Sequence, residues 1–174
     1  SAVRAPPPYG THPVIGAKMK KAVREHGARL ILVDPRKTEL VDWATLWLPL
    51  KPGTDAALVN GLMHVIIQEG WVNQSFIAER TEGYDALWET VRHYPPERVS
   101  EITGVSPPDL FEAARIYALT ERAGIYYTLG ITEHTTGTAN VLNLANLAMI
   151  TGHLGRAFCG VNPLRGQNNV QGAC

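Results

Sequence analysis

The chain has 174 residues, of which 45% are hydrophobic and 18% charged, a composition typical of one globular domain with a buried core rather than of a disordered chain. Its 16 Lys and Arg residues balance 16 Asp and Glu residues, so the basic excess of a nucleic-acid-binding protein is missing. The sequence shows no signal-peptide pattern, no apolar run that would span a membrane and only two cysteines, which together favour a cytoplasmic protein.

The first ten residues, SAVRAPPPYG, are rich in proline and lack periodicity, which predicts an irregular lead-in. A helix is expected from Pro13 to a stop at Gly27, with Thr11 as a candidate N-cap. The apolar runs ARLILVD (28–34) and TLWLPL (45–50) then predict two buried parallel strands.

The rest of the chain continues this alternation. A helix is predicted from Asp55 to Glu69, and GIYYTLG (124–130) predicts a third buried strand. Further helices are expected at 74–80, 83–92, 106–120 and 137–150. Helices that alternate with short apolar strands indicate the α/β class, with a mostly parallel sheet flanked by helices. We therefore predict a Rossmann-like three-layer domain that spans residues 1–174.

Ligands of such sheets bind beyond the carboxyl ends of the strands, which nominates the loops VDPRKT, KPGTD and LGITEHTTG. In the first loop Asp34 can accept hydrogen bonds from a ribose or guanine and its basic neighbours can meet phosphate, although an ordinary capping turn explains the charges equally well. Thr54 or Asp55 is expected to cap the next helix, whose N–H groups would face a ligand along this edge. We expect Asp34 and Asp55 to lie at the same end of one sheet.

Several other chemistries find little support. Glu133 and His134 are adjacent and have no nucleophile nearby, so a catalytic triad is a weak hypothesis. The six histidines form no HxxxH or HExxH pair, and no GxGxxG follows a strand. Asn140, Asn143 and Asn146 form a polar stripe on an otherwise apolar last helix, for which a solvent face is a sufficient explanation.

Residues 152–174 contain too many glycines for a helix and too few β-branched residues for a strand, which predicts a long functional loop. Four apolar residues are expected to anchor it to the core: Leu154, Phe158, Val161 and Leu164. Arg165 then presents a guanidinium suited to a small carboxylate or oxyanion, although a surface turn is the simpler interpretation of that arginine alone.

The run RGQNNVQGAC, with HPVIGAKMKKAVREHGARLILVDPRKT and YPPERVSEITGVSPPDLFEAARIYA ahead of it, resembles the molybdopterin oxidoreductase family, and within it the formate dehydrogenase catalytic (alpha) subunits. The resemblance extends over residues 12–174. It implies two-electron oxidation of formate to carbon dioxide at a molybdenum or tungsten bis-molybdopterin guanine dinucleotide cofactor. A nitrate reductase of the same family and a non-catalytic nucleotide-binding or interaction module remain the alternatives.

The resemblance also implies roles for single residues. It puts the nucleotide part of the cofactor at Val33, Asp34, Pro35, Arg36 and Lys37 and at Gly53, Thr54 and Asp55. It puts the pterin and its pyrophosphate near Leu129, Gly130 and Glu133, where family members commonly carry Met for Leu129 and Gln for Glu133. Arg165 matches the arginine that orients formate, and Gln167 matches a neighbouring glutamine on the cofactor side.

Two features of the family do not occur in this sequence: the cysteines of an N-terminal 4Fe-4S cluster and the Cys or selenocysteine that ligates the metal. We therefore expect an internal fragment of a larger subunit, with residues 152–174 as its substrate and cofactor loop and with no metal ligand. Expressed alone, the fragment is expected to bind no cofactor and to be inactive. The intact subunit would work with electron-transfer subunits.

Overall fold

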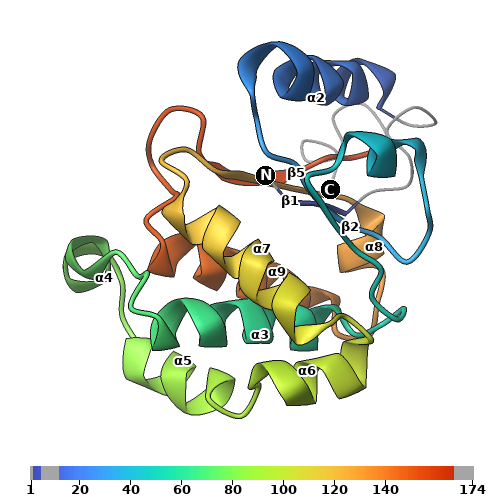
Figure 1. Cartoon of the computed structure of the whole chain (residues 1–174). Coiled ribbons are helices and arrows are strands. Elements are labelled where there is room, and N and C mark those ends of the chain that lie inside the picture. The colour runs from blue at the N-terminus through green and yellow to red at the C-terminus, as the bar shows by residue number, and fades with distance from the viewer. Residues whose placement is uncertain (1, 5–11, 167–174) are drawn as a thin grey trace.

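The computed structural model describes residues 2–4 and 12–166 (Figure 1). Within them the chain forms a parallel sheet of five strands in the order β3-β2-β1-β4-β5. The strands are Ala2–Arg4 (β1), Ile31–Val33 (β2), Leu46–Leu48 (β3), Gly124–Tyr127 (β4) and Gly160–Pro163 (β5). Successive strands are added on one side of β1 and then on the other, so the strand order reverses between β1 and β4. This is the order of a doubly wound fold, and it confirms the predicted α/β class.

Helices cover both faces of the sheet (Figure 1). One face carries α2 (Pro13–His26) and the short 3₁₀ helix η1 (Glu39–Trp43). The opposite face carries three longer helices: α3 (Asp55–Gln68), α7 (Pro107–Leu119) and α9 (Gly137–Ile150). Farther from the sheet lie α4 (Gln74–Arg80), α5 (Tyr84–Val91) and α6 (Pro96–Thr103), while the single turn α8 (Leu129–Thr132) follows β4.

Alternation along the strands divides the core between these two faces. Leu30 and Leu32 are buried under α2 and η1, whereas Ile31 and Ile125 are buried in the larger core formed with α3, α7 and α9. Because both faces of each strand are covered, the strands appear in the sequence as continuous apolar runs.

The packing of α3 depends on one glycine. A Cβ atom added at Gly61 would lie 2.6 Å from Val99 Cγ2 in α6 and 3.2 Å from Leu110 Cδ2 in α7. Both neighbours are fully buried, so neither has room to retreat. Gly61 therefore sets how closely α6 and α7 approach the backbone of α3.

Two segments fold differently from the sequence-based expectation. The lead-in expected to be irregular contains β1, which pairs with strands on both of its sides. The segment 152–174, expected to have no regular structure, contains β5, which pairs with β4. Three or four residues carry too little pattern to identify a strand, and both strands exist because neighbouring backbones pair with them.

The anchors of the last segment were also partly mispredicted. Leu154 and Val161 pack against the core as expected. Phe158 instead is 79% exposed and has a φ of 65°, in the left-handed region that non-glycine residues rarely adopt. Helix α6 was not expected at all, and the N-cap of α2 is His12, while the candidate Thr11 lies outside the described residues.

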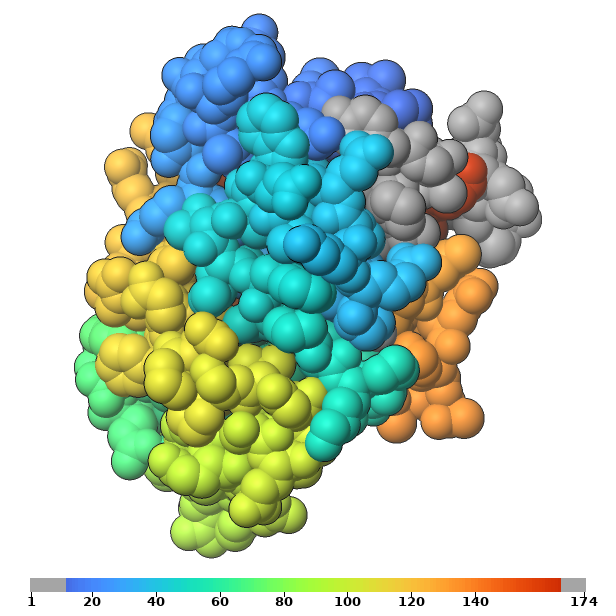
Figure 2. Space-filling view, turned by 45° about the vertical axis from the view of Figure 1, so that its right-hand side comes forward, coloured from blue at the N-terminus to red at the C-terminus, as the bar shows by residue number. Residues whose placement is uncertain are grey.

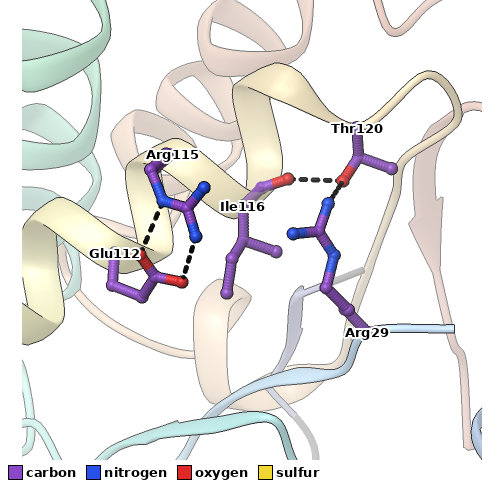
Figure 3. Close-up of polar contacts among 5 residues, drawn as sticks. All are labelled: Arg29, Glu112, Arg115, Ile116 and Thr120. Atoms are coloured by element: carbon purple, nitrogen blue, oxygen red, sulfur yellow. Dashed lines mark hydrogen bonds and ion pairs between the residues drawn. The ribbon is translucent and has the colours of Figure 1, made fainter.

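Polar contacts tie together the amino-terminal edge of the sheet (Figure 3). Arg29 Nη2, just ahead of β2, donates to Thr120 Oγ1 at 2.6 Å, and that hydroxyl donates to the carbonyl of Ile116 at 2.5 Å. Glu112 and Arg115 form a separate two-bond pair on the exposed side of α7, which contributes little to stability at such exposure. Within the described part of the chain, no helix has the length and apolar character needed to cross a membrane.

Candidate functional site

The loops that the sequence predicts to bind a ligand lie together at the carboxyl edge of the sheet. Because the strands are all parallel, Asp34 after β2, the turn after β3, α8 after β4 and Arg165 after β5 leave the sheet at the same end. The space-filling view shows the cyan surface of the segments after β2 and β3 beside the orange surface of α8 and the start of α9 (Figure 2). Asp34 and Asp55 thus both lie at this edge.

Asp34 shapes the first loop of the edge. Its carboxylate is 3% exposed, and Oδ1 accepts a hydrogen bond from the backbone N–H of Arg36 at 2.8 Å. The Arg36 side chain lies 3.4 Å from the same oxygen, and Trp47 Nε1 donates to the Asp34 carbonyl at 2.9 Å. This is an Asx turn locked by a neighbouring strand. It fixes Val33 and Asp34 at the sheet and leaves Pro35 half-buried and Arg36 and Lys37 exposed beyond it.

The second loop presents the amino end of α3 to the edge. Gly53 has a φ of 81°, which allows the chain to turn into the helix at Thr54. The Thr54 hydroxyl donates to the carbonyl of Lys51 at 2.6 Å and does not cap α3, contrary to the expected capping role. Asp55, the first helical residue, is buried. The first N–H groups of α3 therefore face the edge without a side-chain cap, which creates a set of donors for an anionic group.

The third loop holds Leu129 and Gly130 in α8 and Glu133 at its end. Leu129 and Glu133 are exposed, and the N–H of Glu133 donates to the carbonyl of Leu129 at 2.8 Å. His134 Nε2 lies 3.0 Å from the carbonyl of Gly130, which makes it a donor to that oxygen. The imidazole is thus engaged by the backbone of α8 and not by Glu133, in keeping with the weakness of the triad hypothesis.

Arg165 stands two residues beyond β5 and is exposed. The N–H of the preceding Leu164 donates to the carbonyl of Tyr127 at 2.7 Å, which continues the pairing of β5 with β4 past the end of the strand. The arginine is therefore pinned next to the start of α8. Among the described residues its guanidinium has no ion pair, and Gln167 lies outside them.

A small cavity lies just beneath the carboxyl edge of the sheet. Its volume is about 40 Å³, and its walls include Val33 of β2, Tyr127 of β4, Asp55 of α3 and Ile131 of α8. A pocket for an organic ligand needs roughly 300–1,000 Å³, and the walls of this cavity are almost entirely apolar. The cavity is a gap in the core, and any ligand must bind on the loops above it.

Three buried polar atoms at this edge were not predicted from the sequence. Thr38 Oγ1, Thr132 Oγ1 and Asn140 Oδ1 are shielded from solvent and have no hydrogen-bond partner within the described ranges 2–4 and 12–166. The amide nitrogen of Asn140 donates to the carbonyl of Ile131 at 3.1 Å, so its assignment to a solvent face was wrong. Unpaired buried polar atoms are uncommon, and these three lie in segments that leave the carboxyl ends of β2 and β4.

Metal-ligating side chains do not converge here. No group of three or more His, Cys, Asp or Glu residues suitable for a metal ion occurs among the residues described. The carboxyl edge instead carries hydrogen-bonding groups, uncapped helix ends and exposed cations. Such groups suit a ligand that carries phosphate and polar rings.

Comparison with known proteins gives a consistent result. A family model described as molybdopterin oxidoreductase matches residues 7–174. The chain is 48% identical over 166 residues to F420-dependent formate dehydrogenase 1 subunit alpha of Methanococcus maripaludis, covering 95% of this chain and 24% of that protein. It is 44% identical over 167 residues to formate dehydrogenase H of Escherichia coli, covering 96% and 23%.

A solved structure supports the same grouping. Acetylene hydratase from Pelobacter acetylenicus superposes with a TM-score of 0.76 at 33% sequence identity, over 79% of this chain and 19% of that one. The chain spans about a quarter of the length of the curated relatives it matches.

Proposed function

The chain belongs to the molybdopterin oxidoreductase family, and from that premise we propose that its parent protein is the catalytic subunit of a formate dehydrogenase. The observation that carries the proposal is the identity of 44–48% to formate dehydrogenase proteins over almost the whole chain. The reaction converts formate into carbon dioxide, one proton and two electrons. This segment would contribute loops that bind the cofactor and an arginine that binds the substrate.

The family's cofactor fits the residues at the carboxyl edge. In the parent subunit we propose a bis-molybdopterin guanine dinucleotide with molybdenum or tungsten, which supplies the two-electron chemistry when bound. The oxygens of Thr38, Thr132 and Asn140 have no hydrogen-bond partner among the described residues, and the segments that carry them leave the sheet at this edge. The uncapped amino ends of α3 and α9 offer N–H donors to phosphate.

We assign the nucleotide part of the cofactor to the first two loops. Asp34, fixed by its turn, would accept hydrogen bonds from the ribose or guanine, and Arg36 and Lys37 would meet phosphate. Gly53, Thr54 and Asp55 would approach the nucleotide at the amino end of α3. Leu129, Gly130, Glu133 and Gln167 are assigned to the pterin and pyrophosphate.

Arg165 is proposed to orient formate. A guanidinium presents parallel N–H donors that match both oxygens of a carboxylate. Its exposure at the end of β5 and the absence of a competing ion pair in the described part of the chain support this role. Holding formate in a fixed orientation at the metal would accelerate the reaction by positioning alone.

The remaining parts of the enzyme would lie elsewhere in the parent protein. We propose that a 4Fe-4S cluster and partner electron-transfer subunits carry the two electrons away. The low cysteine content supports a cytoplasmic location.

The proposal is tested by assaying the purified parent subunit, loaded with its cofactor, with formate and an artificial electron acceptor. Formate-dependent reduction of the acceptor is expected, with one carbon dioxide released for every two electrons accepted. Reduction of nitrate with no turnover of formate would instead identify another oxidoreductase of the same family.

A further inference from the structure

We propose that a cleft between α3, α5 and α9, away from the carboxyl edge, binds a small ligand in which a cationic group is joined to an apolar stem, such as an alkylguanidinium. The cleft has a volume of about 320 Å³. This volume suits a ligand of about ten non-hydrogen atoms and falls within the lower range of small-molecule sites, which starts at roughly 300 Å³. The residues that matter here are Asn60, Glu82, Leu87, Asn143, Asn146 and Met149.

Asn60 is the first observation that points to a ligand. It lies in the middle of α3, is only 7% exposed, and is surrounded along the helix by apolar core residues. Its carboxamide forms no hydrogen bond to the other described residues, and its nitrogen and oxygen are not fully shielded from solvent, so they remain open to an incoming partner. Since Asn60 lines the cleft, the cleft is the direction from which a partner can approach.

Two more carboxamides enter the cleft from α9. Asn143 and Asn146 are half-buried, line the same space as Asn60, and have no hydrogen bonds from their side chains to other described residues. The polar stripe on α9 is therefore divided in function, because Asn140 bonds to Ile131 near the carboxyl edge while the other two face the cleft. Three carboxamide oxygens on two packed helices form a set of acceptors for N–H donors.

The charged residues around the cleft favour a cationic ligand over an anionic one. Glu82 is a carboxylate on the lining, and no Lys, Arg or His lines the cleft. Burial and the nearby Asp85 carboxylate raise the pKa of Tyr84, another lining residue, so this phenol stays neutral. The cleft also meets the amino end of α5, whose Gly83 N-cap has no side chain, but Asp85 in the first turn offsets the positive end of that helix. An anion would thus meet Glu82 on the lining and the Asp85 carboxylate close by, whereas a cation is favoured.

The apolar part of the cleft lining is the reason for proposing an apolar stem on the ligand. Leu87 of α5 and Met149 of α9 provide apolar walls beside the carboxamides. An aliphatic chain can lie against them while its charged head reaches Glu82 and the asparagines, as the side chain of arginine does at protein surfaces.

The test uses calorimetric titration of the complete, cofactor-loaded parent subunit with two probes of the same shape. Butylguanidinium carries the charge, and butylurea is its neutral counterpart. We expect one butylguanidinium to bind per subunit, and butylurea to bind at least about tenfold more weakly because it lacks a charge-assisted hydrogen bond. Equal affinity for the two probes, or no binding of either, would overturn the proposal.

Substitutions of residues that line the cleft test whether the ligand binds there. Glu82→Gln and Asn146→Leu alter exposed or half-exposed side chains and are expected to leave the fold intact, and each should weaken butylguanidinium binding by about tenfold. Asn60→Leu should weaken it as well, while Glu101→Gln, an exposed carboxylate on α6, is the matched control and should bind like the wild type. Unchanged binding in Glu82→Gln and Asn146→Leu would place the ligand elsewhere and reject this site. Turnover of formate is a separate readout that these variants should not change.

Discussion

Arg165 differs from Arg36, at the same end of the sheet, in having no ion-pair partner among the described residues. Arg36 is engaged with the buried carboxylate of Asp34, at 3.4 Å, within its own turn. Arg165 has no such neighbour among the described residues, and its backbone is held by the bond between Leu164 and Tyr127. A guanidinium without an ion pair, on a backbone that is held in place, suits the binding of a substrate carboxylate.

In the intact enzyme, Arg165→Lys should lower kcat/KM for formate by at least about tenfold, equivalent to about 1.4 kcal/mol of transition-state stabilisation. Lysine keeps the charge but offers a point donor in place of the fork, and formate is too small to gain orientation from apolar contacts. Steady-state kinetics on the variant, with molybdenum and tungsten quantified in the same preparation, gives the measurement.

The matched control is Arg122→Lys, because Arg122 lies ahead of β4 at the opposite edge of the sheet, where it stacks on Phe158. That variant should keep wild-type efficiency. Wild-type efficiency in Arg165→Lys, or a loss of activity fully accounted for by lost metal, would remove Arg165 from the substrate role.

Single residues at this edge differ in how far their positions can be predicted from the sequence. The positions of Asp34 and Asp55 at one edge follow from the predicted parallel strands, because each parallel strand delivers its next residue to the same end. Arg165 reaches this edge through β5, which was not predicted. The burial of Asn140 does not follow, since helical spacing shows that three asparagines share one side of α9 but not what covers each of them. That information depends on the neighbouring helix and loop.

Among the elements, most helices and the strands β2, β3 and β4 were predicted, whereas β1, β5 and α6 were not. Helices α4 and α9 have the predicted bounds, and the end of α2 at Gly27 follows from a glycine that adopts a φ of 61°. Helical periodicity over fourteen residues is enough to define α9, whereas β1 and β5 are defined by their partners. Local sequence thus specifies the longer helices and the strands with apolar runs better than the two strands that lack such runs.

At the scale of helix packing, Gly61→Ala should destabilise the folded chain by about 1–2 kcal/mol. Alanine improves helix propensity by up to about 1 kcal/mol, but its Cβ would overlap the buried Val99, and overpacking a core costs about 1–3 kcal/mol. Urea unfolding followed by circular dichroism measures the difference in the free energy of unfolding between the variant and the wild type.

The double variant Gly61→Ala/Val99→Ala tests the cause. Removing the Val99 methyl groups makes room for the new Cβ, so the loss should be smaller than the sum of the two single losses by at least about 1 kcal/mol. Additive losses would show that the close approach of α6 to α3 is not what Gly61 permits.

For the whole molecule, we expect the purified 174-residue chain to oxidise no formate and to contain no stoichiometric molybdenum, tungsten or iron. The reason is that the sequence lacks the cluster cysteines and the metal-ligating residue of the family, and that it corresponds to about a quarter of its relatives. Elemental analysis by mass spectrometry, together with an assay using formate and an artificial acceptor, checks both statements. One equivalent of any of these metals per chain would contradict the prediction.

The place of β1 at the centre of the sheet has a consequence for how the protein is made. The strand at Ala2–Arg4 finds one neighbour at Ile31 and Leu32, but its other neighbour begins only at Gly124. On the ribosome, α2 and β2 can therefore join β1 early, while the far side of that strand stays open until most of the chain has emerged. Until β4 has emerged, that edge of β1 has no partner within the described residues, and unpaired strand edges are the kind of surface that chaperones protect from aggregation.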